Sequence, residues 1–347
     1  MAHIRWPGAC AAVFAALAAA CTLEFTPPSD ADPIAPQPYA PPSPAVRVTT
    51  TSELVAALAA TQAADIVLAD GEYLPDAHLA PAAAHRLWAE HLGGATIHAG
   101  IVFGTDVGDP GGELHGVRLD TGDRSRTLEG MYVESSLVHV WGVRRNVKIQ
   151  DAWLSGHDAI VTGVLARQTD GLLIERVVIT DMANRAIIAD PNDTTFVAAA
   201  PAVLRDVDVR RVGLDGAGGV DEVYGIAVGS TAELTRVRVR DVGGVALDMR
   251  TACIDTRVDL LTIAGVATGV FTRTGTNGLV IEASSITSAE VGVHLTVMTL
   301  GTELSRISFT GQSYAAIVDE TGAASIGDND YTRIAPGAVQ VTSVPPP

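Results

Sequence analysis

The sequence predicts an all-β protein built as a parallel solenoid, in which short strands stack coil upon coil. The first observation is an apolar pattern that recurs every 23 to 30 residues from residue 149 onward. The second is an alternating pattern that follows within each repeat, as expected of a strand with one buried side. The third is composition: apolar residues make up 47% of the chain and aromatic residues only 5%, so the core is aliphatic, and β-branched residues favour strands.

The first pattern is apolar, two variable, apolar, one variable, apolar. Its units are spaced by 25, 30, 30, 24, 23 and 23 residues and begin at Ile149, Ile174, Leu204, Leu234, Val258, Ile281 and Leu304. A repeat of this length is the signature of a stacked architecture.

The second pattern is a variable residue, then usually Gly or Ala, then an alternating strand. We expect it to begin at Asp158, Arg185, Tyr224, Val245, Thr268, Val291 and Tyr314. A small second residue suits a tight bend into the strand. Two or three strands in about 23 residues make one coil, whereas a leucine-rich repeat needs a helix and an Asn/Cys pattern that is absent.

These repeats resemble the right-handed parallel β-helix superfamily, which includes the pectate lyases and other polysaccharide lyases. The resemblance covers roughly residues 50–330 and implies about nine to ten coils. It is specific for the fold, and it implies action on, or binding of, polysaccharides without identifying a reaction.

The amino end of the repeat region supports the resemblance. Residues 51–58 predict a short capped helix, and residues 65–73 predict a strand and a turn similar to the cap of many such enzymes. Residues 86–143 carry two or three less regular coils. We expect a β-helix domain over 46–335 and a carboxyl-terminal tail over 336–347.

The first 45 residues predict an export signal and a tether. A basic residue and 12 small or apolar residues precede Cys21, too few to span a bilayer. Two interpretations stay open: cleavage of a signal peptide over 1–20, or acylation of Cys21 in a lipobox-like context. Residues 21–45 are rich in Pro, which makes extended spacers and favours the lipoprotein. We expect an outer-membrane or cell-surface lipoprotein, or a secreted protein.

Charge and cysteine content exclude several classes. The net charge is −17 and Lys148 is the only lysine, which argues against nucleic acid and anionic lipid as partners. After removal of Cys10 and modification of Cys21, Cys253 is the only remaining thiol, so no internal disulfide forms. We expect Cys253 to be buried and the protein to be a monomer that contacts the membrane only through its lipid.

Stacking makes each aligned position a row on the surface, about 4.8 Å from coil to coil. The third position of the first strand alternates in sign and includes Asp151, Arg176, Asp206 and Arg236. We interpret it as rows of ion pairs that neutralise stacked like charges, rather than as a binding strip.

The outward positions of the second strand predict a binding patch. Its fourth column is Val161, Ile188, Ala227, Asp248, Phe271, His294 and Ile317, and its sixth is Gly163, Asp190, Gly229, Arg250, Arg273, Thr296 and Asp319. An aromatic ring can stack on a sugar, and guanidinium groups bind hydroxyls or uronic carboxylates. We therefore predict Phe271, Arg250, Arg273 and Asp190 as substrate-binding residues, and Arg250, Arg273, His294 and Asp248 as catalytic candidates.

Two long loops carry carboxylates that are candidate Ca²⁺ ligands, since Ca²⁺ prefers oxygen ligands. These residues are Asp190, Asp193, Asp215, Asp221 and Glu222. No regular calcium-loop spacing is present, so we predict no required cofactor, with Ca²⁺ as the alternative.

Enzyme motifs are mostly missing. Asp190-Pro191-Asn192-Asp193 is similar to the Asp-Pro-His-Asp motif of alginate epimerases, but Asn192 replaces the His and Ile187 stands where those enzymes have a Tyr. The first hypothesis is a carbohydrate-binding or structural surface protein. The alternative is a polysaccharide lyase acting on an acidic polysaccharide, which we favour over a glycoside hydrolase or an epimerase.

Overall fold

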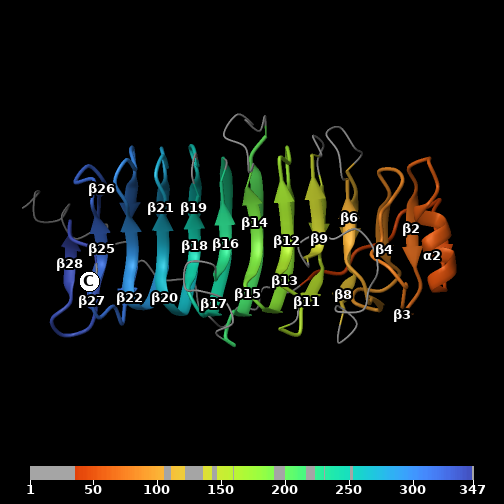
Figure 1. Ribbon diagram of the computed structural model, residues 1–347, viewed down its shortest axis with the longest axis horizontal. Helices are drawn as coiled ribbons and strands as arrows, with labels where there is room; N and C mark the ends of the chain where they lie inside the picture. The colour runs from red at the N-terminus through yellow and green to blue at the C-terminus, as the bar shows by residue number, and fades with distance from the viewer. Residues whose placement is uncertain are drawn as a thin grey trace, which may run out of the picture.

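The chain folds as a right-handed parallel β-helix of about ten coils, as the repeats predicted. In this computed structural model the described residues are 36–104, 111–121, 136–142, 147–158, 160–190, 200–215, 223–229, 231–250 and 253–345. The coils stack along one axis, with α2 (Thr51–Leu58) at one end of the solenoid and β28 (Val339–Thr342) at the other (Figure 1). Three strand positions per coil form three faces.

The first face holds strands at the start of each coil. They are β1 (Val46–Val48), β2 (Asp65–Leu68), β4 (Arg86–Ala89), β7 (Glu113–His115), β10 (Lys148–Gln150), β13 (Leu173–Met182), β15 (Ala202–Val212), β17 (Ala232–Val242), β19 (Arg257–Asp259), β21 (Val280–Glu282), β23 (Glu303–Ser305) and β26 (Ser325–Ile326).

The second face follows a corner in each coil, and the long strands β13, β15 and β17 continue onto it. Its other strands are β3 (Gly71–Tyr73), β5 (Ala95–Ile97), β8 (Arg118–Asp120), β11 (Trp153–Ser155), β20 (Thr262–Thr272), β22 (Ser285–Leu295), β24 (Ser308–Thr310) and β27 (Asp330–Arg333).

The third face closes each coil, and β20 and β22 continue onto it. Its other strands are β6 (Ile101–Phe103), β9 (Ser136–Trp141), β12 (Thr162–Arg167), β14 (Arg185–Asp190), β16 (Tyr224–Val228), β18 (Val245–Met249), β25 (Ala315–Asp319) and β28 (Val339–Thr342).

The register confirms the first repeat pattern at every unit. Ile149 pairs with Ile174, Ile174 with Leu204, and Leu204 with Leu234, and the column continues to Leu304. These residues are at most 1% exposed and belong to one continuous core. Like side chains therefore stack on like side chains along the interior, which buries apolar surface without gaps.

The second pattern was misplaced in two coils. Arg185 pairs with Thr162 rather than with Asp158, and Val291 pairs with Ala315 rather than with Tyr314. In the earlier coil the Gly156 turn takes up four more residues before the strand begins. In the later coil two consecutive alanines, Ala315 and Ala316, both satisfy the small-residue requirement, so the pattern alone cannot place the bend.

The small residue after the bend has a steric cause. A Cβ on Gly269 would lie 2.4 Å from the Gly292 carbonyl oxygen, and a Cβ on Gly292 would lie 2.5 Å from that of Ala316. These two positions therefore have no room for a Cβ, and small residues fill the whole column: Ala186, Gly225, Ala246, Gly269, Gly292 and Ala316.

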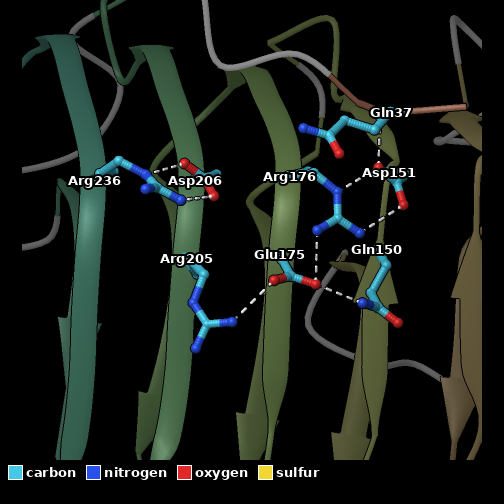
Figure 2. Close-up of polar contacts among 8 residues, drawn as sticks. All are labelled: Gln37, Gln150, Asp151, Glu175, Arg176, Arg205, Asp206 and Arg236. Atoms are coloured by element: carbon cyan, nitrogen blue, oxygen red, sulfur yellow. Dashed lines mark hydrogen bonds and ion pairs between the residues drawn. The ribbon is translucent and has the colours of Figure 1, made fainter.

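The corner between the first and second faces is built from residues with positive φ that are not glycine. Asp151, Arg176, Asp206 and Arg236 have φ of 55°, 54°, 54° and 51°. Their side chains form two bidentate ion pairs between neighbouring coils, Arg176 with Asp151 at 2.7 and 2.9 Å and Arg236 with Asp206 at 2.6 Å for both contacts (Figure 2).

The next corner repeats this arrangement, because Arg211 binds Asp181 at 2.6 and 2.7 Å and holds the pKa of that carboxyl below its usual range. The interpretation of these rows as ion pairs is thus confirmed.

The predicted capping helix is α2 (Thr51–Leu58), which covers the first coil. The Thr50 hydroxyl accepts a hydrogen bond from the Glu53 backbone N–H, and Leu54 and Leu58 are buried against the core. The helix keeps the first coil from exposing an open end.

Part of the Pro-rich segment lies along the solenoid. The Gln37 backbone N–H donates to Asp151 at 2.7 Å (Figure 2), and the Tyr39 hydroxyl lies 2.8 and 2.9 Å from the carbonyl oxygens of Ala89 and His115. Tyr39 fills the space above Gly116, where a Cβ would lie 2.0 Å from its hydroxyl oxygen. Burial there raises the pKa of Tyr39. Residues 37–39 therefore bind to the coils rather than extending away from them.

The carboxyl end continues the solenoid further than predicted. Strand β28 pairs with β25, so the last coil extends into the segment expected to be a tail. Within the described ranges, no helix is long and apolar enough to cross a bilayer.

Gly116→Ala tests the docking of the Pro-rich segment. We expect it to displace Tyr39 and to lower the free energy of unfolding by at least 1 kcal/mol more, roughly one buried hydrogen bond, than Gly322→Ala does. The φ of Gly322 is 63°, similar to the 70° of Gly116, but a Cβ added at Gly322 would meet no atom within 4 Å. Urea unfolding measures both variants. Equal losses in the free energy of unfolding would show that the docking of Tyr39 does not depend on the space above Gly116.

Candidate functional site

The third face brings five of the predicted residues together. Asp248 pairs in register with Phe271, and Phe271 with His294, on the neighbouring strands β18, β20 and β22. Inward residues of these strands, such as Leu247 and Val270, belong to the solenoid core, so the register directs the predicted side chains away from that core.

The predicted columns need correction at their ends. Leu165 and Val318 replace Val161 and Ile317 in the fourth column, and the register places Arg167 where Gly163 was expected in the sixth. Glu320 follows Asp319, which pairs with Leu295, so Glu320 takes the place predicted for Asp319.

Asp248 is the buried centre of this patch. Its side chain is 0% exposed and lies between two guanidinium groups. Arg273 Nε donates to its two oxygens at 2.9 and 3.1 Å, and Arg250 Nε lies 3.7 Å away. Because this carboxylate is in contact with both arginines and shielded from solvent, it positions them. Its role as a catalytic candidate stays a prediction.

The aromatic side of the patch combines Phe271 and His294. The two rings meet edge to face with centroids 5.1 Å apart, and the Arg273 guanidinium lies 5.7 Å from the Phe271 ring. His294 Nε2 is 2.7 Å from Glu320 Oε1, and their side chains are 12% and 19% exposed. Glu320 was missed by the sequence reasoning because the one-residue error in the last strand placed Asp319 in its position.

Tyr224 fixes the other side of the patch. The guanidinium groups of Arg250 and Arg185 lie 5.4 and 5.3 Å from its ring. Tyr224 is 2% exposed and packs with Leu165, Ile188 and Ala227 in a small apolar cluster outside the main core. The guanidinium groups of Arg185 and Arg250 therefore pack against this buried cluster, and the Tyr224 ring is not accessible to a ligand.

A second aromatic group, His139 and Trp141, lies on β9 of the same face. Trp141 is 40% exposed, with the Arg167 guanidinium 5.6 Å from its ring. Beside it, His139 is 4% exposed and its Nδ1 has no hydrogen-bond partner. Burial, and then the charge of Arg167, lower the pKa of His139 to about 4. Irregular spacing before residue 147 concealed this part of the face from the sequence alignment.

The metal prediction is largely outside the described residues. The described residues do not include Asp193, Asp221 and Glu222, and only the backbone of Asp190 is described. The lipidation candidate Cys21 also lies outside the described residues. Asp215 follows β15 at an exposed position. Among the described ranges no three His, Cys, Asp or Glu side chains gather as a metal site would require.

Lys148 lies away from the patch around Asp248, whereas the Cys253 backbone N–H donates to the Arg250 carbonyl oxygen at 3.2 Å. Lys148 Nζ binds Glu113 at 2.9 Å on the first face, where His115 also binds Glu113 at 2.9 Å. These two hydrogen bonds, His115 first, lower the pKa of Glu113 to about 2. Cys253 is fully buried, as predicted, with its Sγ 3.0 Å from the Thr256 hydroxyl.

A depression of about 510 Å³ lies near the corner between the second and third faces. Its lining residues are Val242, Gly265, Val266, Ala267, Thr287, Ser288, Ala289 and Gly311. It contains no ionisable side chain, so it provides no acid–base chemistry.

Comparison with solved structures shows that the chain shares the right-handed parallel β-helix fold. The A-module of the mannuronan C-5 epimerase AlgE4 from Azotobacter vinelandii is 15% identical with a TM-score of 0.52, over 86% of this chain and 100% of the module. An alginate lyase from Paenibacillus sp. str. FPU-7 is 16% identical with a TM-score of 0.48, over 86% and 97%. No protein-family profile and no curated sequence matches the chain.

The burial of His139 predicts acid sensitivity. Its folded-state pKa of about 4 lies below the ordinary value of 6.5, so the unfolded chain binds more protons between these values. Stability should therefore fall as pH falls from 6.5 to 4, by about 2 kcal/mol at pH 5. Urea unfolding at pH 7.5 and pH 5 measures the loss. His139→Gln should reduce the loss by that amount, and an unchanged loss would contradict the assignment.

Proposed function

We propose that the third face binds the sugar units of an acidic polysaccharide through Arg250, Arg273 and Phe271. The observation that carries the proposal is the hydrogen bond from Arg273 Nε, shared between both oxygens of buried Asp248, with Phe271 partly exposed beside it. A buried carboxylate that orients two arginines preorganises them, which lowers the entropy lost when a ligand binds.

The charges of this patch favour an anionic ligand. Arg250, Arg273 and Asp248 carry two positive charges and one negative, so the three side chains have a local charge of +1 in a chain whose net charge is −17. The two guanidinium groups are 30% and 35% exposed. Guanidinium forks match carboxylates in geometry, and a uronic acid presents a carboxylate on each sugar ring.

The aromatic groups support a carbohydrate rather than a small anion. Phe271 lies one coil beyond Asp248, and Trp141 lies several coils toward the amino end of the same face. Exposed aromatic faces at intervals along one surface suit a linear polymer. The epimerase and the alginate lyase that share the fold act on polysaccharides by their names, which agrees with this ligand class.

The location of the protein follows from this proposal and the amino-terminal sequence. A glycan-binding solenoid behind an export signal belongs at the cell surface or in the medium, with Cys21 as the lipid attachment site. Labelling with a radioactive fatty acid, compared between the wild type and Cys21→Ala, tests the anchor. Equal labelling of the two proteins would overturn it.

Binding variants test the site. Arg273→Lys keeps the charge but loses the guanidinium fork, and we expect its affinity for uronic-acid oligosaccharides to fall about tenfold, the value of one charge-assisted hydrogen bond. Phe271→Leu should lose a similar amount for both uronic and neutral ligands. The matched control is Arg257→Lys, on the first face of the neighbouring coil.

Calorimetric titration measures these affinities. Equal affinities in all three variants, or no binding of any polysaccharide in a panel, would overturn the proposal.

The contact between His294 and Glu320 supports a second candidate, a polysaccharide lyase. If His294 Nε2–H donates to Glu320, Nδ1 is free to accept the proton on C5 of a uronate. The electrons of that C–H bond form a C4–C5 double bond, the C4–oxygen bond breaks, and the leaving oxygen takes a proton. Neighbouring Arg273 would neutralise the uronate carboxylate.

Ultraviolet absorbance of the unsaturated product tests this candidate against a panel of uronic polysaccharides. A rise in absorbance that is lost in His294→Gln, with sugar binding retained, would establish the lyase. New reducing ends without absorbance would indicate hydrolysis. Binding with silence in both assays would leave a binding protein.

A further inference from the structure

The second face carries a separate cluster of arginines on β15 and β17, which lie side by side in the solenoid (Figure 1). Asp208 pairs in register with Arg238, and Arg210 with Arg240. These four residues belong to none of the candidate sites described above.

The cluster contains more positive charges than negative ones, because its arginines share one carboxylate. Arg240 Nη2 donates to the two Asp208 oxygens at 3.2 and 3.0 Å, and Arg210 Nη2 lies 3.7 Å from the same carboxylate. Asp208 is 5% exposed, so its charge is held within the cluster. Two like charges in register on adjacent strands repel each other, and one carboxylate neutralises only one of them.

The hydrogen bonding of this pair is incomplete. Nε of Arg210 and Nε of Arg240 are both buried without a partner. The corner arginines differ, because Arg211 and Arg236 each use Nε and Nη2 together on one carboxylate. An orphaned buried donor is unfavourable and commonly marks a place where a water or an ion completes the structure.

The surroundings of the cluster leave it open to solvent. The Arg210 and Arg240 side chains remain 37% and 30% exposed. Toward the carboxyl end, Thr262 pairs with Arg238 and is followed in register by Ser285 and Ser308. These side chains are short, and Thr262 and Ser308 are only 6% and 7% exposed, so they do not cover the arginines.

We propose that Arg210 and Arg240 form an oxyanion-binding site on the second face. A sulfate, phosphate or carboxylate group lying between the two guanidinium forks would supply the missing negative charge and accept their N–H groups. The oxyanion is either a free inorganic ion or a substituent of a polysaccharide. This site is distinct from the proposed sugar-binding patch on the third face.

Calorimetric titration of the full-length protein with sodium sulfate and with sodium phosphate, at constant ionic strength set by sodium chloride, tests the site. We expect saturable binding that weakens at least tenfold in Arg210→Gln and in Arg240→Gln. Arg205→Gln is the matched control, because Arg205 lies on the first face of the same strand and is 48% exposed. Its affinity should equal that of the wild type.

Two further measurements keep the result decisive. The first is the affinity of Arg240→Lys, which retains the positive charge of the side chain. The second is far-ultraviolet circular dichroism, which shows whether each variant keeps its β-structure. A sulfated oligosaccharide that binds at least tenfold more tightly than free sulfate identifies a polysaccharide as the source, whereas equal affinity identifies the free ion. Absence of saturable binding by either anion, or equal affinity in folded Arg210→Gln, Arg240→Gln and Arg205→Gln, would overturn the proposal.

Discussion

The structure depends on one constraint, the in-register stacking of parallel strands from coil to coil. Every residue of a coil lies directly above its counterpart in the preceding coil, so each column must tolerate repetition at the spacing of a β-sheet. Inside, the column from Ile149 to Leu304 meets this condition with aliphatic residues. At the bend into the third face, Gly269 and Gly292 lie so close to the next coil that neither position has room for a Cβ.

The same constraint explains where charge is tolerated. Stacked like charges repel, and the corners avoid this by alternating Asp and Arg, which join neighbouring coils through bidentate ion pairs (Figure 2). Left-handed backbone at Asp151, Arg176 and their counterparts turns the chain between faces. The ion pairs and the turn therefore occur at the same positions, so the corners of neighbouring coils are connected where the backbone is least regular.

At two places on the faces, two arginines share one carboxylate, unlike the one-to-one pairing of Asp and Arg at the corners. On the third face, Arg250 and Arg273 share the buried carboxylate of Asp248 next to Phe271. On the second face, Arg210 and Arg240 share that of Asp208. A regular scaffold fixes the backbone under each pair, so the arginines are oriented by their neighbours rather than by a flexible loop. Such preorganisation is what a binding surface requires.

The sequence by itself determined the fold, the first-strand register and the grouping of Asp248, Phe271 and His294, because a repeat in a stacked structure specifies which residues become neighbours. It failed where the repeat is irregular: Thr162 and Ala315 begin their strands later than expected, which hid Arg167 and Glu320 from the site. Tertiary structure alone decided burial and partners. Asp248 is buried and accepts a hydrogen bond from Arg273, Trp141 is exposed, and Tyr39 docks above Gly116, since side-chain packing between coils leaves no periodic trace in the sequence.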